Sequence, residues 1–220
     1  MSSKIADSFK SLLDSLAEKT ALKPSDDISF LIYRDLLKIR EAQWHYKTKM
    51  NREIDYSTAD IFQDILAHYI RSSLSKDYTI HLELKVKKLR PDILIKKNGV
   101  NWAIIEVKTN IGWDRDLIKD ENYLKRLNLL GSTFNIPLKR IFYIFESSAN
   151  VSAEFSKIFK SAKQDKIKDF IFPLFENGAV PYYLTKDKSS PKVFSEKEIF
   201  DLYNSTKITP FSLILDKITA

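Results

Sequence analysis

Apolar positions recur every three or four residues in the N-terminal part of the chain, a spacing typical of amphipathic helices. Residues 26–45 carry this pattern directly after Ser25, a residue type favoured at the N-cap, and are predicted to form one helix. The spacing predicts a second helix over residues 59–74. Three polar residues lie beside the apolar stripe of this second helix: Asp60, Gln63 and Asp64.

From residue 78 the apolar period changes from helical spacing to two. Residues 78–87 alternate apolar and polar side chains, which predicts a strand with one buried face. Two more strands are predicted over 91–96 and 100–109, because a turn containing Asn98 and Gly99 separates two apolar runs. The strands over 91–96 and 100–109 are expected to be adjacent and antiparallel.

The C-terminal half alternates between helical and strand patterns. We predict a helix over 117–130, a strand over 140–147, a helix over 152–167, and strands over 169–175 and 180–184. Pro173 and Pro181 restrict the last two strands to edges or breaks, because proline donates no hydrogen bond to a neighbouring strand. Ser195 and Glu198 have the spacing of a capping box and predict a C-terminal helix.

This order of elements predicts an α/β fold with a mixed central sheet flanked by helices on both faces. The 220 residues, 44% of them hydrophobic, suffice for one good core, and no repeat or linker divides them. We therefore expect a single domain. It would comprise an N-terminal helical region over 1–57, a core over 58–147 and a C-terminal extension over 148–220.

Two charged residues interrupt the apolar strand 100–109, namely Glu106 and Lys108. Half-buried charges in a sheet are costly unless they are paired, hydrogen-bonded or bound to metal. Asp92 begins the preceding strand, and the loop length decides whether it shares a face with Glu106. A two-residue turn puts Asp92 opposite Ile105 and on the other face, whereas a three-residue loop puts it opposite Ile104 and on the same face. We expect the longer loop, because only that register lets the two carboxylates converge on one divalent cation.

Pro91-Asp92 followed by Glu106-Val107-Lys108 on the neighbouring strand, with helices before and after, resembles the PD-(D/E)XK nuclease superfamily. The resemblance covers about residues 58–147. It implies that Asp92 and Glu106 ligate Mg²⁺, or Mn²⁺ as the alternative metal, and that the Val107 carbonyl is a further ligand. Lys108 would position or deprotonate the attacking water. The family also places an acid on the preceding helix, and the candidates are Asp60 and Asp64, with Glu83 as a third.

Net charge favours a polyanionic partner, since 36 Lys and Arg stand against 29 Asp and Glu, a net charge of +7. Basic residues flank the proposed site on both sides in the sequence. The candidates for phosphate contacts are Lys85, Lys87, Lys88, Arg90, Arg115, Lys119, Lys125 and Arg126, with Trp113 and Asp114 beside Arg115. Duplex DNA is the expected partner, and a two-fold homodimer is the simplest way to cut both strands.

Composition restricts the remaining function classes. The chain has no cysteine, which excludes disulfides, zinc thiolate sites and a cysteine nucleophile, and which fits a reducing cytoplasm. The three histidines, at 45, 68 and 81, lack metal-ligand spacing. No run is apolar enough to span a membrane, and residues 1–19 lack the uninterrupted apolar run of a signal peptide.

The sequence thus predicts a Mg²⁺-dependent deoxyribonuclease acting on duplex DNA, of the type II restriction kind. Three alternatives stay open. These are a repair-type nuclease, a nucleic-acid-binding module that keeps the fold without hydrolysis, and a structural or interaction protein in which Glu106 and Lys108 form an ordinary ion pair.

Overall fold

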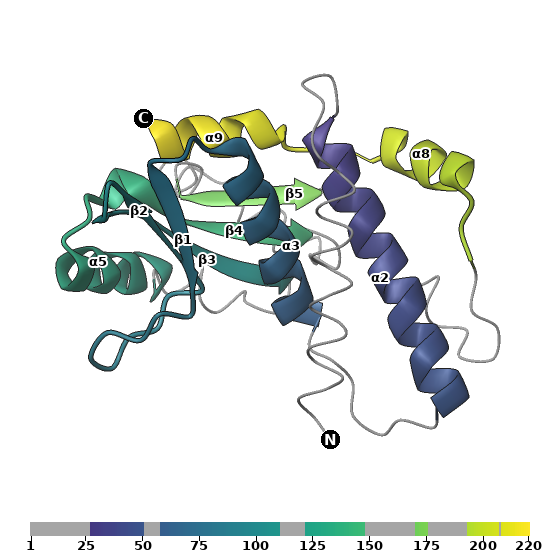
Figure 1. Cartoon of the computed structure of the whole chain (residues 1–220), viewed down its shortest axis with the longest axis horizontal. Helices are drawn as coiled ribbons and strands as arrows, with labels where there is room; N and C mark the ends of the chain where they lie inside the picture. The colour runs from purple at the N-terminus through teal and green to yellow at the C-terminus, as the bar shows by residue number, and fades with distance from the viewer. Residues whose placement is uncertain (1–26, 51–57, 111–121, 148–169, 176–192, 207) are drawn as a thin grey trace.

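A five-stranded sheet forms the centre of the protein in the computed structural model, which describes residues 27–50, 58–110, 122–147, 170–175, 193–206 and 208–220 (Figure 1). The strands are β1 (Tyr78–Leu82), β2 (Ile93–Lys97), β3 (Val100–Asn110), β4 (Ile141–Ser147) and β5 (Ile171–Phe175), and they lie side by side in this order. β1, β2 and β3 are antiparallel, whereas β3, β4 and β5 run parallel. The sheet is therefore mixed, and the predicted α/β class is confirmed.

Helices cover both faces of this sheet (Figure 1). One face packs against α2 (Ile28–Met50), α3 (Thr58–Ser73) and α9 (Phe211–Thr219), and α8 (Glu196–Asn204) packs on α2. The other face packs against α5 (Asn122–Phe134), which connects β3 to β4 and precedes the short 3₁₀ helix η1 (Leu138–Arg140). Alternate residues of β2, β3 and β4 consequently enter two separate apolar cores, as in β3, where Ile104 faces α5 and Ile105 faces α3.

Local sequence signals explain several element boundaries. Asp27 accepts hydrogen bonds from the backbone N–H groups of Ser29 and Phe30, so Asp27 caps α2. Ser25, the predicted cap, lies outside the described residues. The predicted capping box is confirmed at α8, where Ser195 and Glu198 each accept from the other's backbone. Pro173 lies in β5, which is an edge strand of the described sheet, as predicted.

The predicted strand 78–87 is too long. β1 ends at Leu82, and the chain leaves the sheet at Glu83, whose φ of 51° is in the left-handed region. Residues 83–92 then form a loop that the Glu83 N–H closes by donating to the Asp92 carbonyl at 3.0 Å. The loop contains a tight turn at Lys87, φ 56°, between the paired residues Val86 and Leu89. The alternation was misleading because Leu84, Val86 and Leu89 pack on the α5 side without being in a strand.

The predicted three-residue loop between β2 and β3 is wrong. Asn98 and Gly99 have φ values of 51° and 80°, and Lys97 pairs with Val100, so the turn has two residues, as in type I′ hairpins. The register nevertheless shifts further along, because Lys96 pairs with Asn101 but Ile95 pairs with Ala103. Trp102 is the extra residue of a β-bulge in β3, and it reverses the facing that the turn alone would impose.

Two predicted segments lie outside the described residues, namely the helix at 152–167 and the strand at 180–184, and so do residues 117–121 of the predicted 117–130 helix. Among the residues that the structure does describe, no helix is long and apolar enough to cross a membrane.

Candidate active site

Asp92 lies opposite Glu106 in the β2–β3 hairpin. Ile93 pairs with Ile105, so one further step along the antiparallel ladder brings the two acids to adjacent positions on the same side of the sheet. This is the facing that the sequence analysis required, reached by a two-residue turn plus the Trp102 bulge. Asp92 is opposite Glu106 rather than opposite Ile104 as predicted.

Asp92 is fixed by groups of the neighbouring strand. Its Oδ2 atom accepts a hydrogen bond from the backbone N–H of Val107 at 2.7 Å. The ammonium nitrogen of Lys108 lies 3.8 Å from the same oxygen. Both side chains are partly exposed, so the ion pair faces solvent at one edge of the site. Asp92, Glu106 and Lys108 thus lie together, as the sequence predicted.

Glu106 is more deeply placed and has a different partner. The residue is only 3% exposed. The guanidinium of Arg126 on α5 binds it, with Nη2 to Oε2 at 3.1 Å, Nε to Oε2 at 3.2 Å and Nη2 to Oε1 at 3.4 Å. Arg126 also donates to the Arg90 carbonyl at 3.4 Å. Helix α5 is therefore tied to β3 and to the 83–92 loop that carries Asp92.

Burial raises the pKa of the Glu106 carboxyl above its ordinary value near 4.5, and the negative charge of Asp92 raises it further. The positive charges of Arg126 and Lys108 act in the opposite direction but do not cancel the rise. The site thus holds two facing carboxylates that repel each other, with a cation beside each. Each carboxylate of the pair therefore already has a positively charged partner.

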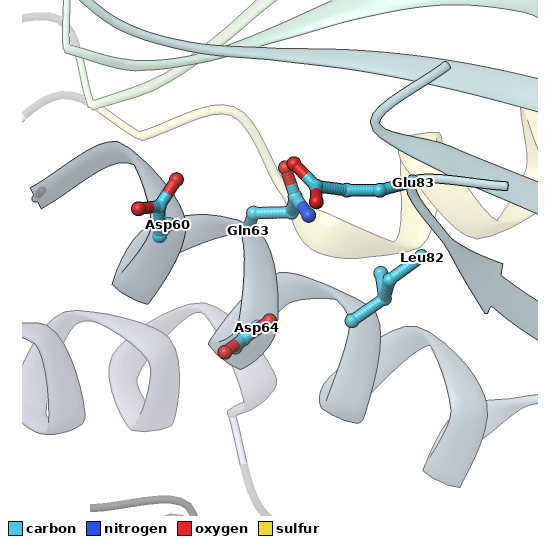
Figure 2. Close-up of a pocket in the computed structure, with 5 residues that line it drawn as sticks. All are labelled: Asp60, Gln63, Asp64, Leu82 and Glu83. Carbon is cyan, nitrogen blue, oxygen red and sulfur yellow. The ribbon is translucent and has the colours of Figure 1, made fainter. Parts of the chain in front are cut away.

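The helix acids and Glu83 lie in a different place. A pocket of about 260 Å³ is lined by Asp60, Gln63 and Asp64 of α3 together with Leu82 and Glu83 (Figure 2). Asp60 and Asp64 are exposed, whereas Gln63 is buried, and Figure 2 shows the Gln63 and Glu83 side chains pointing toward each other. Glu83 also pairs with Arg90 at 3.6 Å.

Two carboxylates form the donor set at the hairpin. Within the described part of the chain no three acidic or histidine side chains come close enough to hold a metal ion together, so Asp60, Asp64 and Glu83 do not join Asp92 and Glu106. The hard oxygens of Asp92 and Glu106 suit Mg²⁺, which commonly takes one or two carboxylates and several waters. Val107 already uses its N–H on Asp92, and its side chain packs on the opposite face of the sheet. The residues present therefore fit a divalent cation, provided that it competes successfully with Arg126 for Glu106.

The predicted phosphate-binding residues divide into three groups. Lys85, Lys87, Lys88 and Arg90 are exposed on the loop that leaves β1, the blue loop below that strand in Figure 1. Lys125 is exposed on α5, while the adjacent Arg126 turns to Glu106. Arg115 and Lys119, with Trp113 and Asp114, lie outside the described residues.

Sequence reasoning missed the pairing of Arg126 with Glu106. The available signal was the demand for compensation: a glutamate in an apolar strand needs a cation, and the helix after that strand packs across it. Arg126 is the basic residue of α5 that lies beside Tyr123 and Leu127, both of which are buried, whereas Lys125 is exposed.

Comparison with protein-family models, with curated proteins and with solved structures gives no significant match for this chain. What the described fold and site define is a class: an α/β domain with a mixed five-stranded sheet and a carboxylate pair with two cations at the hairpin. The resemblance to the PD-(D/E)XK superfamily rests on the residues themselves.

Proposed function

We propose that the chain is a Mg²⁺-dependent nuclease that hydrolyses phosphodiester bonds of duplex DNA, with a restriction endonuclease-like core. The observation that carries the proposal is the convergence of Asp92, Glu106 and Lys108 on one side of the β2–β3 hairpin. The order of a helix, three antiparallel strands, a helix and a parallel strand around this site supports it.

Each residue of the chain has a distinct part in this function. Asp92 and Glu106 would hold the metal, which supplies positive charge to the phosphate and lowers the pKa of water. The Val107 N–H holds the Asp92 carboxylate in one orientation, so that this side chain would lose little conformational freedom when a metal binds. Lys108 places a cation next to Asp92, where it can stabilise negative charge near the nucleophile. The exposed cations on the 83–92 loop would bind phosphates.

The assembly and setting belong to the same proposal. A type II restriction-type enzyme would act as a homodimer, because two-fold symmetry places one site on each strand of a duplex. A chain without cysteine is suited to the reducing cytoplasm. A repair-type nuclease would use the same site without a fixed recognition sequence.

One observation favours a second candidate, a nucleic-acid-binding module without hydrolysis. Arg126 and Lys108 already neutralise the two carboxylates, and such pairs also occur as purely structural features. The basic loop would then bind DNA and the site would only hold α5 to the sheet. Structural ion pairing of this kind makes no use of Mg²⁺.

Cleavage assays separate these candidates. Plasmid, linear duplex and single-stranded DNA are incubated with the parent protein in Mg²⁺, in Mn²⁺ and with chelator. Glu106→Gln is assayed in parallel, and the matched control is Asp201→Asn, an exposed acid on α8. Metal-dependent cleavage by the parent and by Asp201→Asn, lost in Glu106→Gln, supports the nuclease. DNA binding without cleavage under any metal supports the binding module.

The products and the helix acids can be tested in the same assay. Discrete bands indicate restriction, and a smear indicates non-specific or repair-type cleavage. Asp60→Asn and Asp64→Asn test whether an acid of α3 contributes, and activity lost in only one of the two identifies it. If both variants cleave as fast as the parent, neither residue belongs to the site.

A further inference from the structure

Arg126 is the link between α5 and the carboxylate pair. Its guanidinium contacts both oxygens of Glu106, at 3.1 to 3.4 Å, and the Arg90 carbonyl at 3.4 Å. The Arg126 side chain is 32% exposed, whereas the Glu106 side chain is 4% exposed. Arg126 therefore covers Glu106 from the solvent side.

The contacts of Glu106 leave little room for a second cation. Both carboxylate oxygens already accept hydrogen bonds from one guanidinium. A metal ion needs these same oxygens, and a buried carboxylate cannot turn to offer a different edge as an exposed one can. A metal ion and Arg126 therefore compete for Glu106. An unpaired Glu106 in this position would carry a large cost, so one cation has to replace the other.

We propose that Arg126 is a positioning residue that exchanges with the metal ion: it neutralises Glu106 when no metal is bound, and it releases Glu106 when a divalent cation binds. This inference rests on the proposed metal-dependent function. The released guanidinium stays at the solvent edge of α5, beside the exposed Lys125. There it is available to a phosphate, for which arginine is suited by its planar set of donors.

The proposed exchange can be distinguished from a purely structural role of Arg126 by the effect of its removal on metal affinity. If Arg126 only held α5 in place, its removal would weaken metal binding, because the site would lose its shape. A competing cation has the opposite effect: its removal weakens the metal-free protein but strengthens metal binding. Stability and metal affinity are therefore expected to change in opposite directions.

The test measures metal binding and stability without any DNA. Mg²⁺ and Mn²⁺ are titrated calorimetrically into the parent, Arg126→Met, Arg126→Lys, Glu106→Gln and the double variant with Arg126→Met and Glu106→Gln. Lys197→Met, which removes an exposed cation on α8, is the matched control. Thermal melts with chelator and with metal accompany each titration. Arg126→Lys keeps a cation and serves as the folded comparison if Arg126→Met does not fold.

The expected result is a half-saturating metal concentration about tenfold lower in Arg126→Met than in the parent, with a smaller change of the same sign in Arg126→Lys. Arg126→Met should melt at a lower temperature in chelator and recover more with metal than the parent does. Lys197→Met should bind as the parent does. The effect of Arg126→Met should vanish in the Glu106→Gln background, because the competition is for that carboxylate.

Three results overturn the exchange. If the parent binds metal through Glu106 but Arg126→Met or the folded Arg126→Lys binds it equally or more weakly, Arg126 is structural and the proposed metal site survives. If Arg126→Met strengthens binding equally in the Glu106→Gln background, Arg126 acts elsewhere. If no variant, the parent included, binds either metal, the exchange and the proposed metal-dependent function fall together.

Discussion

The backbone N–H of Val107 donates a hydrogen bond to Oδ2 of Asp92 at 2.7 Å. The carboxylate that precedes β2 is thereby oriented by the strand that carries Glu106 and Lys108. A single backbone N–H thus connects Asp92 to the strand of Glu106 and Lys108, and this hydrogen bond does not depend on the side chain of Val107. Variants that change the charge of Asp92 can retain this bond.

Asp92→Asn should lower cleavage by orders of magnitude while leaving the fold intact. The amide oxygen of asparagine can still accept from Val107, but the charge that a metal requires is lost. Single-turnover cleavage over a range of Mg²⁺ concentrations measures the loss, and a thermal melt confirms folding. Asp201→Asn should cleave as the parent does. Parental rates in Asp92→Asn would remove this carboxylate from the mechanism.

Lys108→Met should retain metal binding but lose most turnover, by about 10²–10³-fold, because the residue supplies charge beside the nucleophile and no ligand. Calorimetric titration with Mn²⁺ measures the first quantity, and single-turnover cleavage measures the second. Lys197→Met, on α8, controls for loss of a positive charge. A variant that binds metal and cleaves normally would assign Lys108 to a structural ion pair with Asp92.

Stability should depend on pH through Glu106. Its pKa is raised in the folded protein above the ordinary value near 4.5, so the folded state holds this proton more tightly than the unfolded state. The resulting stabilisation is complete below that ordinary value and is lost as the pH rises through the raised pKa. Glu106→Gln cannot lose a proton, so its free energy of unfolding should rise relative to the parent over this window.

Chemical denaturation from about pH 4 to about pH 8 measures this difference. Asp201→Asn serves as the control and should show no such rise relative to the parent. A difference between Glu106→Gln and the parent that stays constant with pH would mean that the ion pair with Arg126 fully offsets burial.

Trp102→Phe should destabilise the protein while leaving the site in place. The indole N–H donates to the Ile218 carbonyl of α9 at 2.7 Å, and the Arg140 guanidinium carbon lies 3.3 Å from the ring centroid. Loss of the donor and a weaker cation–π contact should cost about 1–2 kcal/mol. Urea denaturation measures the cost, and faster hydrogen exchange in α9 locates it. Unchanged protection of α9 would contradict the assigned anchor.

DNA affinity should fall steeply with salt, by a log–log slope of about −0.9 per phosphate contacted. Lys85→Met and Lys87→Met on the 83–92 loop should each reduce the magnitude of this slope by about 0.9, the value for one phosphate contact. Lys197→Met on α8 should leave the slope unchanged. Binding is measured in Ca²⁺ to prevent cleavage. A flat salt dependence in the parent would indicate a protein or small-molecule partner.

Much of the sheet could be predicted because its signals are local. Asn98-Gly99 is the local signal of the two-residue turn that forms, although the longer loop was expected, and the Ser195–Glu198 capping box starts α8 as predicted. The same logic failed at Glu83, because the apolar period of two continues through residues that leave the sheet and still pack against it. A periodic pattern reports which side chains are buried, and it does not report the partner that buries them.

Three residues of the site were identified from the sequence, but the backbone geometry that brings them together was not. The types and order of Asp92, Glu106 and Lys108 indicated a shared face, and that proved correct, but the reason given was the wrong loop. A bulge depends on long-range pairing and has no local signature at Trp102. The partner of Glu106 was likewise invisible, since 20 residues separate it from Arg126 and only packing of α5 brings them together.

The Trp102 bulge also determines which changes in length the hairpin can tolerate. Side-chain facing in a strand reverses with each residue, so the number of residues between Ile95 and Ala103 sets whether Asp92 and Glu106 meet. Adding or removing one residue there would turn one acid to the opposite core. Adding two residues would lengthen the hairpin and keep Asp92 and Glu106 on the same face. The length of the hairpin can therefore change only in even steps if the two acids are to stay on one face.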